Sequence, residues 1–370
     1  MNMIYYLLLL VSYLLPAHVL ADEWPMFMKD QGHSSYVDKA PTPPLTLKWQ
    51  YKTEGPVYSS PVVYGNKVFI GSYDSYLYVL DARTGALLWR FKTEGEILSV
   101  PAVSDGLVFF GSKDGHVYAL DINDGKLIWR HSTGGGVLTS PVIMDGMVYI
   151  ASNDLYLYAL DAKDGKRVWR SLLLDYKYSG IYSSPVYKDG IVYIAGKNGR
   201  IYALDGKSGA RSWSFTTLST IYTSPSIYEG ILYIASNDRI LYGFDLNEKK
   251  EVFSKVLDDW AYSSPVVLNG VVFIALKNGS LKGFDIKDGA EKINYKFPDE
   301  VNSTMAVSGN SVAYVGCEDG YLYAMKMDKE KVGVIWKYKT GGGVRSSPAV
   351  AGNMVYVGSK DGYVYAFGNY

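Results

Sequence analysis

Residues 61–92, PVVYGNKVFIGSYDSYLYVLDARTGALLWRFK, contain four short runs rich in β-branched and aromatic residues. The runs cover 61–64, 67–72, 76–81 and 87–91. Gly65-Asn66, between the first two, is the kind of pair that forms a two-residue hairpin turn. Equivalent pairs in other units are Asp105-Gly106, Asp145-Gly146, Asp189-Gly190, Asn269-Gly270 and Gly352-Asn353. No window has a sustained 3.6-residue period, so the stretch predicts four antiparallel strands and no substantial helix.

A Ser-Ser-Pro-like triplet recurs eight times, at intervals of 40, 40, 44, 40, 40, 40 and 43 residues. The copies are Ser59-Ser60-Pro61, Ser99-Val100-Pro101, Thr139-Ser140-Pro141, Ser183-Ser184-Pro185, Thr223-Ser224-Pro225, Ser263-Ser264-Pro265, Ser303-Thr304-Met305 and Ser346-Ser347-Pro348. A unit of about forty residues that holds four strands is typical of a propeller blade.

The two ends of the chain carry incomplete units that complement each other. Residues 47–51 are a fourth strand without the first three, and residues 348–367 supply three strands without a fourth. Joining them gives eight whole blades and removes two exposed sheet edges, which would invite aggregation. We predict an all-β, eight-bladed propeller of four-stranded antiparallel blades, in which the N-terminal strand completes the last blade.

The predicted order of segments begins with an apolar leader. We interpret residues 1–21 as a cleaved secretory signal, 22–44 as a lead-in segment and 45–370 as a single propeller. An uncleaved anchor is the alternative, but the apolar run of about 17 residues is short for a membrane span. We expect a periplasmic or secreted monomer with no transmembrane span after cleavage. The single cysteine, Cys317, excludes an internal disulfide and is expected to act as a buried small hydrophobe.

Charge and residue spacing exclude several classes of function. Lys plus Arg and Asp plus Glu each number 37, so there is no basic footprint for nucleic acid. His33, His116 and His131 are not at metal-ligand spacing and there is no Cys/His cluster, so we expect no metal site of the zinc type. We identify no catalytic set.

The third turn and fourth strand of each unit carry a conspicuous pattern. It begins with Asp81, which can cap the turn, continues with Gly85, which suits a left-handed conformation, and ends with Trp89, which can pack between blades. The tryptophans expected to dock in this way are Trp49, Trp89, Trp129, Trp169, Trp213 and Trp336. The pattern resembles the tryptophan-docking repeat of the pyrroloquinoline-quinone (PQQ) propeller superfamily, and residues 24–34 resemble its lead-in segment.

Three units depart from this pattern. Lys249 and Phe253 replace the Gly and Trp of the sixth unit, Ile293 replaces the Trp of the seventh, and Lys326 replaces the Asp of the eighth. We expect weaker packing between blades at these places.

The superfamily resemblance implies one of two functions. Its quinoprotein dehydrogenases are longer, and they typically carry a vicinal cysteine pair and calcium ligands, whereas this chain has no Cys-Cys. The compact members include the non-catalytic scaffold of the outer-membrane β-barrel assembly machine. The resemblance therefore favours a non-catalytic scaffold for an envelope protein partner, with no cofactor. The alternatives are a PQQ- and calcium-dependent alcohol or sugar dehydrogenase, or a propeller that binds a small ligand at its channel mouth.

The residue just before each triplet is expected at the mouth of the central channel. These residues, with a tryptophan two positions before one of them, give the candidate ligand site Tyr58, Tyr182, Tyr222, Trp260, Tyr262, Asn302 and Arg345; Leu98 and Leu138 complete the ring. They could bind a flat or anionic ligand by stacking and a charge-assisted hydrogen bond, or the tyrosines could simply plug the channel. Nearby acids that could ligate calcium, or be solvated loop charges, are Glu54, Glu96, Asp258, Asp259, Asp299 and Glu300.

One loop is longer than its equivalents. Sixteen residues separate Trp169 from Pro185, where other units have twelve. Insertions in repeats often serve binding, which makes this segment a candidate partner-binding loop. Its apolar residues are Leu172, Leu173, Leu174, Tyr176 and Tyr178. The alternative is that the leucines extend the fourth strand, with alternate residues buried.

Overall fold

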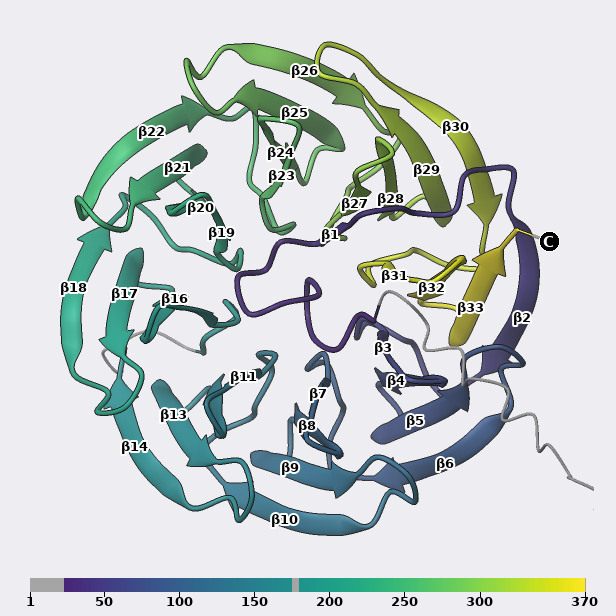
Figure 1. Cartoon of the computed structure of the whole chain (residues 1–370), viewed down its shortest axis with the longest axis vertical. Coiled ribbons are helices and arrows are strands. Elements are labelled where there is room, and N and C mark those ends of the chain that lie inside the picture. The colour runs from purple at the N-terminus through teal and green to yellow at the C-terminus, as the bar shows by residue number, and fades with distance from the viewer. Residues whose placement is uncertain (1–22, 175–179, 370) are drawn as a thin grey trace, which may run out of the picture.

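The computed structural model describes residues 23–174 and 180–369, which form eight β-sheets arranged in a ring around a central axis (Figure 1). No helix occurs among these residues. The predicted eight-bladed propeller is therefore confirmed. The proposed signal, residues 1–21, lies outside the described residues.

Each blade has four antiparallel strands, with the first nearest the axis and the fourth at the rim (Figure 1). Blade 1 comprises β3 (Val62–Tyr64), β4 (Lys67–Gly71), β5 (Tyr76–Asp81) and β6 (Leu87–Lys92). Blade 2 comprises β7 (Ala102–Ser104), β8 (Leu107–Gly111), β9 (His116–Asp121) and β10 (Leu127–Ser132). Blade 3 comprises β11 (Val142–Met144), β12 (Met147–Ala151), β13 (Tyr156–Asp161) and β14 (Arg167–Leu172). Blade 4 comprises β15 (Val186–Lys188), β16 (Ile191–Ala195), β17 (Arg200–Asp205) and β18 (Arg211–Thr216).

The second half of the ring repeats this order. Blade 5 comprises β19 (Ser226–Tyr228), β20 (Ile231–Ser236), β21 (Ile240–Asp245) and β22 (Lys250–Val256). Blade 6 comprises β23 (Val266–Leu268), β24 (Val271–Ala275), β25 (Ser280–Asp285) and β26 (Glu291–Lys296). Blade 7 comprises β27 (Ala306–Ser308), β28 (Val312–Gly316), β29 (Tyr321–Met327) and β30 (Val332–Lys339). Blade 8 comprises β31 (Ala349–Ala351), β32 (Met354–Gly358), β33 (Tyr363–Gly368) and β2 (Thr46–Lys52).

Blade 8 closes the ring as predicted. Strand β2 pairs antiparallel with β33, with Trp49 opposite Ala366 and Lys52 opposite Tyr363. The fourth strand of the last blade therefore comes from the other end of the chain. Closure leaves no blade with a missing outer strand.

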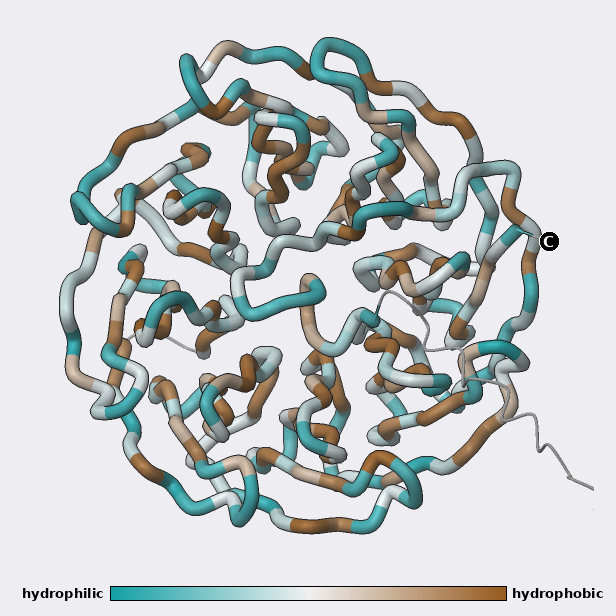
Figure 2. Tube along the Cα trace, in the orientation of Figure 1, coloured by the Kyte–Doolittle hydropathy of each residue, from teal (hydrophilic) through white to brown (hydrophobic). Residues whose placement is uncertain are grey.

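The middle strands of each blade are buried on both faces because a neighbouring blade covers each side. Strand β12, for example, is buried from Val148 to Ala151, whereas the rim strand β6 has no fully buried residue. Accordingly, the middle strands are continuous apolar runs, and hydrophilic residues concentrate towards the rim (Figure 2).

Four tryptophans of rim strands each bond to the third turn of the following blade. Trp129 Nε1 donates a hydrogen bond of 2.9 Å to Ala162 O in the third turn of the following blade. Gly165 in that turn has φ +70°, and a Cβ there would come within 2.5 Å of the Trp129 ring. Only glycine combines this left-handed backbone with such a close approach. Trp49, Trp89 and Trp169 make the equivalent bonds to Ala82, Ile122 and Gly206.

The triplet has two structural roles. Its first hydroxyl bonds the second strand of the same blade, as Thr139 Oγ1 does with both N and O of Ala151 at 3.0 and 2.8 Å. Its second hydroxyl accepts from the backbone N–H of the preceding blade's triplet, as Ser184 Oγ does from Ser140 N at 2.9 Å. The resulting hydroxyl belt has seven links, with donor and acceptor residues 100→140, 140→184, 184→224, 224→264, 264→304, 304→347 and 347→60.

The hydroxyl belt has one gap, because Val100 cannot accept the N–H of Ser60. Val100→Thr would supply a hydroxyl of nearly the same shape, as Thr304 does in blade 7. We expect this change to raise the free energy of unfolding by about 0.5–1.5 kcal/mol, the net value of one buried hydrogen bond. Val108→Thr is the control, because its hydroxyl would have no such donor. Denaturant unfolding measures both variants, and an equal free energy of unfolding in the two would contradict the proposed role of the hydroxyl belt.

The described part of the lead-in segment, residues 23–44, crosses the central channel and bonds to inner strands on several sides of the ring (Figure 1). Its carbonyl oxygens accept from the backbone N–H groups of five first strands; the pairs are Trp24 with Val63, Pro25 with Val103, Gln31 with Tyr187, Gly32 with Ile227 and Ser35 with Val307. Strand β1 (Tyr36–Val37) then runs parallel to β27, which gives blade 7 a fifth strand that the sequence pattern did not predict. The lead-in thereby satisfies backbone donors that would otherwise face an empty channel.

His33 anchors the lead-in to blade 5. It is buried, and its Nδ1 lies 2.9 Å from Pro225 O. Burial lowers the pKa of His33 to about 4, although the bond to Pro225 opposes the shift. The folded protein therefore holds the neutral imidazole, with Nδ1–H donating to the carbonyl.

The depressed pKa of His33 predicts a loss of stability in acid. Between pH 6.5 and 4 the unfolded chain binds a proton that the folded protein does not, so stability is full above pH 6.5 and falls as pH drops towards 4. The loss from this residue should be about 3 kcal/mol. His33→Asn keeps a residue type that tolerates the φ of +58° and should flatten this part of the curve. Urea unfolding at several pH values in this range measures the free energy of unfolding of both proteins. The same change with pH in the two proteins would contradict the assignment.

Candidate functional site

The residues that precede the triplets lie at the end of the channel opposite the lead-in. The lead-in reaches the first hairpins of two blades, where Gly65 N donates to Glu23 Oε1 and Asn310 Nδ2 donates to Ala40 O. The triplets begin the same inner strands at their other end. The channel is therefore occupied at the hairpin end, and the opposite end forms the mouth.

Three of the predicted mouth tyrosines form a row across blades 4–6. The ring centroids of Tyr182 and Tyr222 are 5.5 Å apart, and those of Tyr222 and Tyr262 are 5.6 Å apart. Lys197 Nζ lies 4.6 Å from the Tyr182 ring and 5.4 Å from the Tyr222 ring. Desolvation lowers the pKa of Lys197. The row therefore presents aromatic faces together with one weakly solvated cation.

Two cavities continue the mouth beyond this row. The larger, about 530 Å³, is lined by Tyr262, Lys277, Glu300, Asn302 and Arg345. The smaller, about 360 Å³, shares Lys277 and Glu300 with it and includes the ring of Trp260. Lys277 Nζ lies 5.6 Å from that ring. This side of the mouth therefore combines aromatic rings and a cation with the carboxylates of Asp259, Asp299 and Glu300.

A largely buried carboxylate, Glu318, organises the far side of the mouth. It accepts from Lys360 Nζ at 2.6 Å, from Asn302 Nδ2 at 3.1 Å and from Arg345 Nε. Burial alone would raise the pKa of Glu318, but the bonds from Lys360 and Arg345 outweigh it and lower the pKa. Asn302 Oδ1 is buried and has no hydrogen-bond partner among the described residues. This oxygen is a vacant acceptor in the wall of the larger cavity.

Tyr58 joins the same cluster from blade 1. Its ring centroid lies 4.7 Å from that of Tyr73, 5.7 Å from the Arg345 guanidinium and 5.9 Å from Lys360 Nζ. The predicted mouth residues are thus brought together in two groups, the tyrosine row and the Glu318 cluster.

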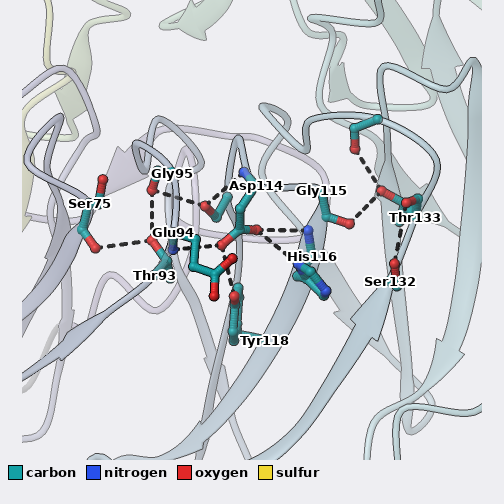
Figure 3. Close-up of polar contacts among 12 residues, drawn as sticks. Ser75, Thr93, Glu94, Gly95, Asp114, Gly115, His116, Tyr118, Ser132 and Thr133 are labelled. Atoms are coloured by element: carbon teal, nitrogen blue, oxygen red, sulfur yellow. Dashed lines mark hydrogen bonds and ion pairs between the residues drawn. The ribbon is translucent and has the colours of Figure 1, made fainter.

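The mouth loops are tied down by carboxylates of the second turns. Asp114 accepts from Glu94 N at 3.0 Å, from His116 N at 2.9 Å and from the Tyr118 hydroxyl at 2.8 Å (Figure 3). Burial and this bond raise the pKa of Tyr118, so the phenol stays protonated and donates. Asp74, Asp154, Asp238 and Asp361 bond the equivalent loops. A fixed backbone here means that the mouth is preorganised.

The sequence interpretation missed a second ring of mouth residues. Lys197, Lys277, Glu318 and Lys360 all immediately precede the Asp or Asn of a second turn. The equivalents in the other blades are Tyr73, Lys113, Asn153 and Asn237. The signal was present in the repeat alignment, since this position holds a polar or aromatic residue in every unit.

The expectation that the long loop exposes its leucines is wrong. Leu173 and Leu174 are 3% and 2% exposed and pack in the core between blades 3 and 4. Leu172 ends β14 opposite Tyr156, and Leu173 N donates to Leu155 O at 2.9 Å. Strand β14 is no longer than β6 or β10, and Leu173 makes the backbone bond that Thr93 and Thr133 make in their blades. The strand is therefore not extended, and Leu173 and Leu174 fill the core rather than form an exposed patch for a partner. Tyr176 and Tyr178 lie outside the described residues.

The described residues offer no group of three or more His, Cys, Asp or Glu side chains able to hold a metal ion. At the mouth, the carboxylate of Glu318 is already neutralised by Lys360 and Arg345. Glu318 is therefore a poor calcium ligand, because calcium needs several oxygens free of competing cations. Cys317 is buried, and burial raises the pKa of its thiol to about 12, so it is not a reactive thiolate.

Comparison with known proteins gives two family matches. The family described as "Beta-alanine-activating enzyme, beta-propeller" matches residues 46–327, and that described as "Outer membrane protein assembly factor BamB" matches residues 296–369. No curated protein matches the sequence. Between Glu23 and Asn369, omitting 175–179, the chain forms no helix long and apolar enough to cross a membrane.

Several solved structures share the architecture. BamB from Moraxella catarrhalis aligns with a TM-score of 0.77 at 21% identity, over 88% of this chain and 100% of that one. A europium-containing methanol dehydrogenase aligns with a TM-score of 0.82 at 14% identity, over 94% and 98% of the chains. Quinohemoprotein alcohol dehydrogenase from Comamonas testosteroni aligns with a TM-score of 0.79 at 16% identity, over 94% and 80%. At these identities the likeness concerns the fold.

Proposed function

We propose that this chain, which belongs to the family described as "Beta-alanine-activating enzyme, beta-propeller" and is a PQQ-like eight-bladed propeller, is a non-catalytic scaffold that binds another protein. Its site of action would be outside the cytoplasm, in the assembly of envelope or outer-membrane proteins. The partial match to the assembly-factor family supports that context. Propellers host many functions, so the proposal rests on the surface of the mouth rather than on the fold.

The observation that carries the proposal is the apolar surface around the mouth of blades 4–6. Tyr182, Trp260 and Tyr262 are 44%, 42% and 37% exposed although they are large aromatic residues. Leu218, on the same set of loops, is 87% exposed and held by a bond from its N–H to Asp238. Exposed tyrosine and tryptophan on a rigid backbone, flanked by Lys and Arg, are typical of the energetic centre of a protein interface.

The test is a quantitative capture experiment from envelope extract with the purified native protein and two variants. Trp260→Ala combined with Tyr262→Ala should lower recovery of a specific partner by about tenfold or more, the effect of removing interface anchors. Leu88→Ala, an exposed apolar residue at the start of rim strand β6, is the matched control and should leave recovery unchanged. If the double variant recovers the same proteins in the same amounts as the native protein, the mouth is not the interface.

A small planar anion is a second candidate for the mouth. Its support is the presence of two cations, Lys277 and Arg345, in one cavity, where the unpartnered Asn302 Oδ1 could accept from an N–H or O–H group of the ligand. Adding PQQ without metal should quench the fluorescence of nearby Trp260, and Arg345→Gln should weaken that binding several-fold, since charge-assisted bonds are the strong ones. Equal quenching of native protein and variant would remove this candidate.

A further inference from the structure

A third cavity lies at the other end of the channel, between the lead-in and blades 5 and 6. Its volume is about 380 Å³. Its floor includes Ile227, Val267 and Leu268, and Tyr36 and Tyr228 are part of its wall. The volume is at the lower end of the range for small-molecule sites. Neither the expected scaffold role nor the mouth uses this cavity.

Ser226 brings a polar group to a position that is otherwise apolar. It is the first residue of β19, and the equivalent residues of the other blades are Val62, Ala102, Val142, Val186, Val266, Ala306 and Ala349. Ser226 is only 3% exposed and lines the cavity. Its Oγ has no hydrogen-bond partner in the described part of the chain. A buried hydroxyl without a partner is unfavourable, and a bound polar group would satisfy it.

The backbone of β23 offers a second vacant donor. On one side of the cavity Gly32 O accepts from Ile227 N at 2.8 Å, and on the other Ser35 O accepts from Val307 N at 2.9 Å. Val267 is the equivalent residue of blade 6, paired with Val272 as Ile227 is paired with Leu232. The lead-in passes from β19 to β27 without giving β23 a carbonyl, and no described residue accepts from Val267 N. The cavity thus occupies the place where a carbonyl group is missing.

We propose that this cavity binds a small neutral molecule with an apolar body and a carbonyl group. The carbonyl oxygen accepts from Val267 N–H, as lead-in carbonyls do in the neighbouring blades, and a polar edge of the ligand bonds Ser226 Oγ. The lining contains no Lys, Arg, Asp or Glu, which favours an uncharged ligand. Burial raises the pKa of both Tyr36 and Tyr228 and lowers that of His33, so these walls are neutral too.

N-acetyl-leucinamide is a suitable probe, because it joins two amide carbonyls to one branched apolar group. In protein with isotope-labelled Ile, Leu and Val methyl groups, titration should shift the resonances of Ile227, Val267 and Leu268 in a saturable way. A molecule of this size is expected to bind with a Kd on the order of millimolar. Ser226→Ala should weaken binding about fivefold, the effect of one hydrogen bond. The variant has the alanine that blades 2, 7 and 8 already carry, so it should fold.

Three further variants distinguish binding in this cavity from binding at other surfaces. Tyr228→Ala removes part of its wall and should abolish saturation, whereas Tyr64→Ala, the equivalent residue of blade 1, should have no effect. Trp260→Ala at the mouth should also have no effect, so failure here is distinguishable from failure of the scaffold proposal. Absence of a saturable shift at the three methyl-bearing residues, or unchanged affinity of Ser226→Ala, overturns the proposal.

Discussion

A protein lacking residues 23–52 is expected to lose cooperative folding and to aggregate, because this deletion removes strand β2 together with the lead-in. Without β2, the edge of β33 is exposed along its whole length. The blade-to-blade contact of Trp49 with the turn of blade 1 is lost as well, including its 3.0 Å bond to Ala82 O. The combined loss should exceed about 5 kcal/mol, which is comparable with the whole stability of an ordinary domain.

A shorter deletion is the control for ring closure. Removal of residues 23–44 keeps β2 and opens only the hairpin end of the channel, so we expect a destabilised but cooperatively folding ring. Circular dichroism melting and light scattering distinguish the two proteins. If both deletions melt alike, β2 does not close the ring in the way that its pairing indicates.

Trp129→Ala is expected to lower the free energy of unfolding by about 3–5 kcal/mol, as truncation of a buried tryptophan does. The indole ring of Trp129 fills the space between blades 2 and 3 over Gly165, and its removal leaves a cavity lined by a backbone that cannot collapse. The loss of its Nε1 donor also leaves Ala162 O without that partner. Denaturant unfolding at neutral pH measures the change.

Trp213→Ala is the matched comparison. Trp213 is only partly buried, and within the described residues it makes no hydrogen bond to the next blade, where Lys249 stands in place of the turn glycine. We expect a cost no more than about half that of Trp129→Ala, since less area is buried. Equal costs would mean that docking over the turn glycine contributes little.

The fold was predictable because each of its determinants repeats. The hairpin residues Asp105-Gly106, Asp145-Gly146 and Asp189-Gly190 all take positive φ, as their identities require. Ring closure followed from the complementary incomplete units. Repetition averages out the ambiguity of any single unit, which is why strand order and blade number could be derived without coordinates.

The candidate site was only partly predictable because it depends on departures from the repeat. The extra residues after Trp169 were recognised as an insertion, but sequence length does not determine which way Leu173 and Leu174 point, and they fill the core. Glu318 and its partners come from two neighbouring blades, 7 and 8, so their meeting depends on ring geometry. Ser226 was overlooked because the chain contains many serines. This one is unusual only when it is compared with the valines and alanines at the equivalent positions of the other blades.

The lead-in segment lies across the hairpin end of the channel, so the mouth and the cavity beside Ser226 lie at opposite ends of the ring. A partner bound to Trp260 and Tyr262 would cover the mouth of the channel. The cavity beside Ser226, between the lead-in and blades 5 and 6, would stay uncovered by such a partner, so the two sites could be occupied independently of each other.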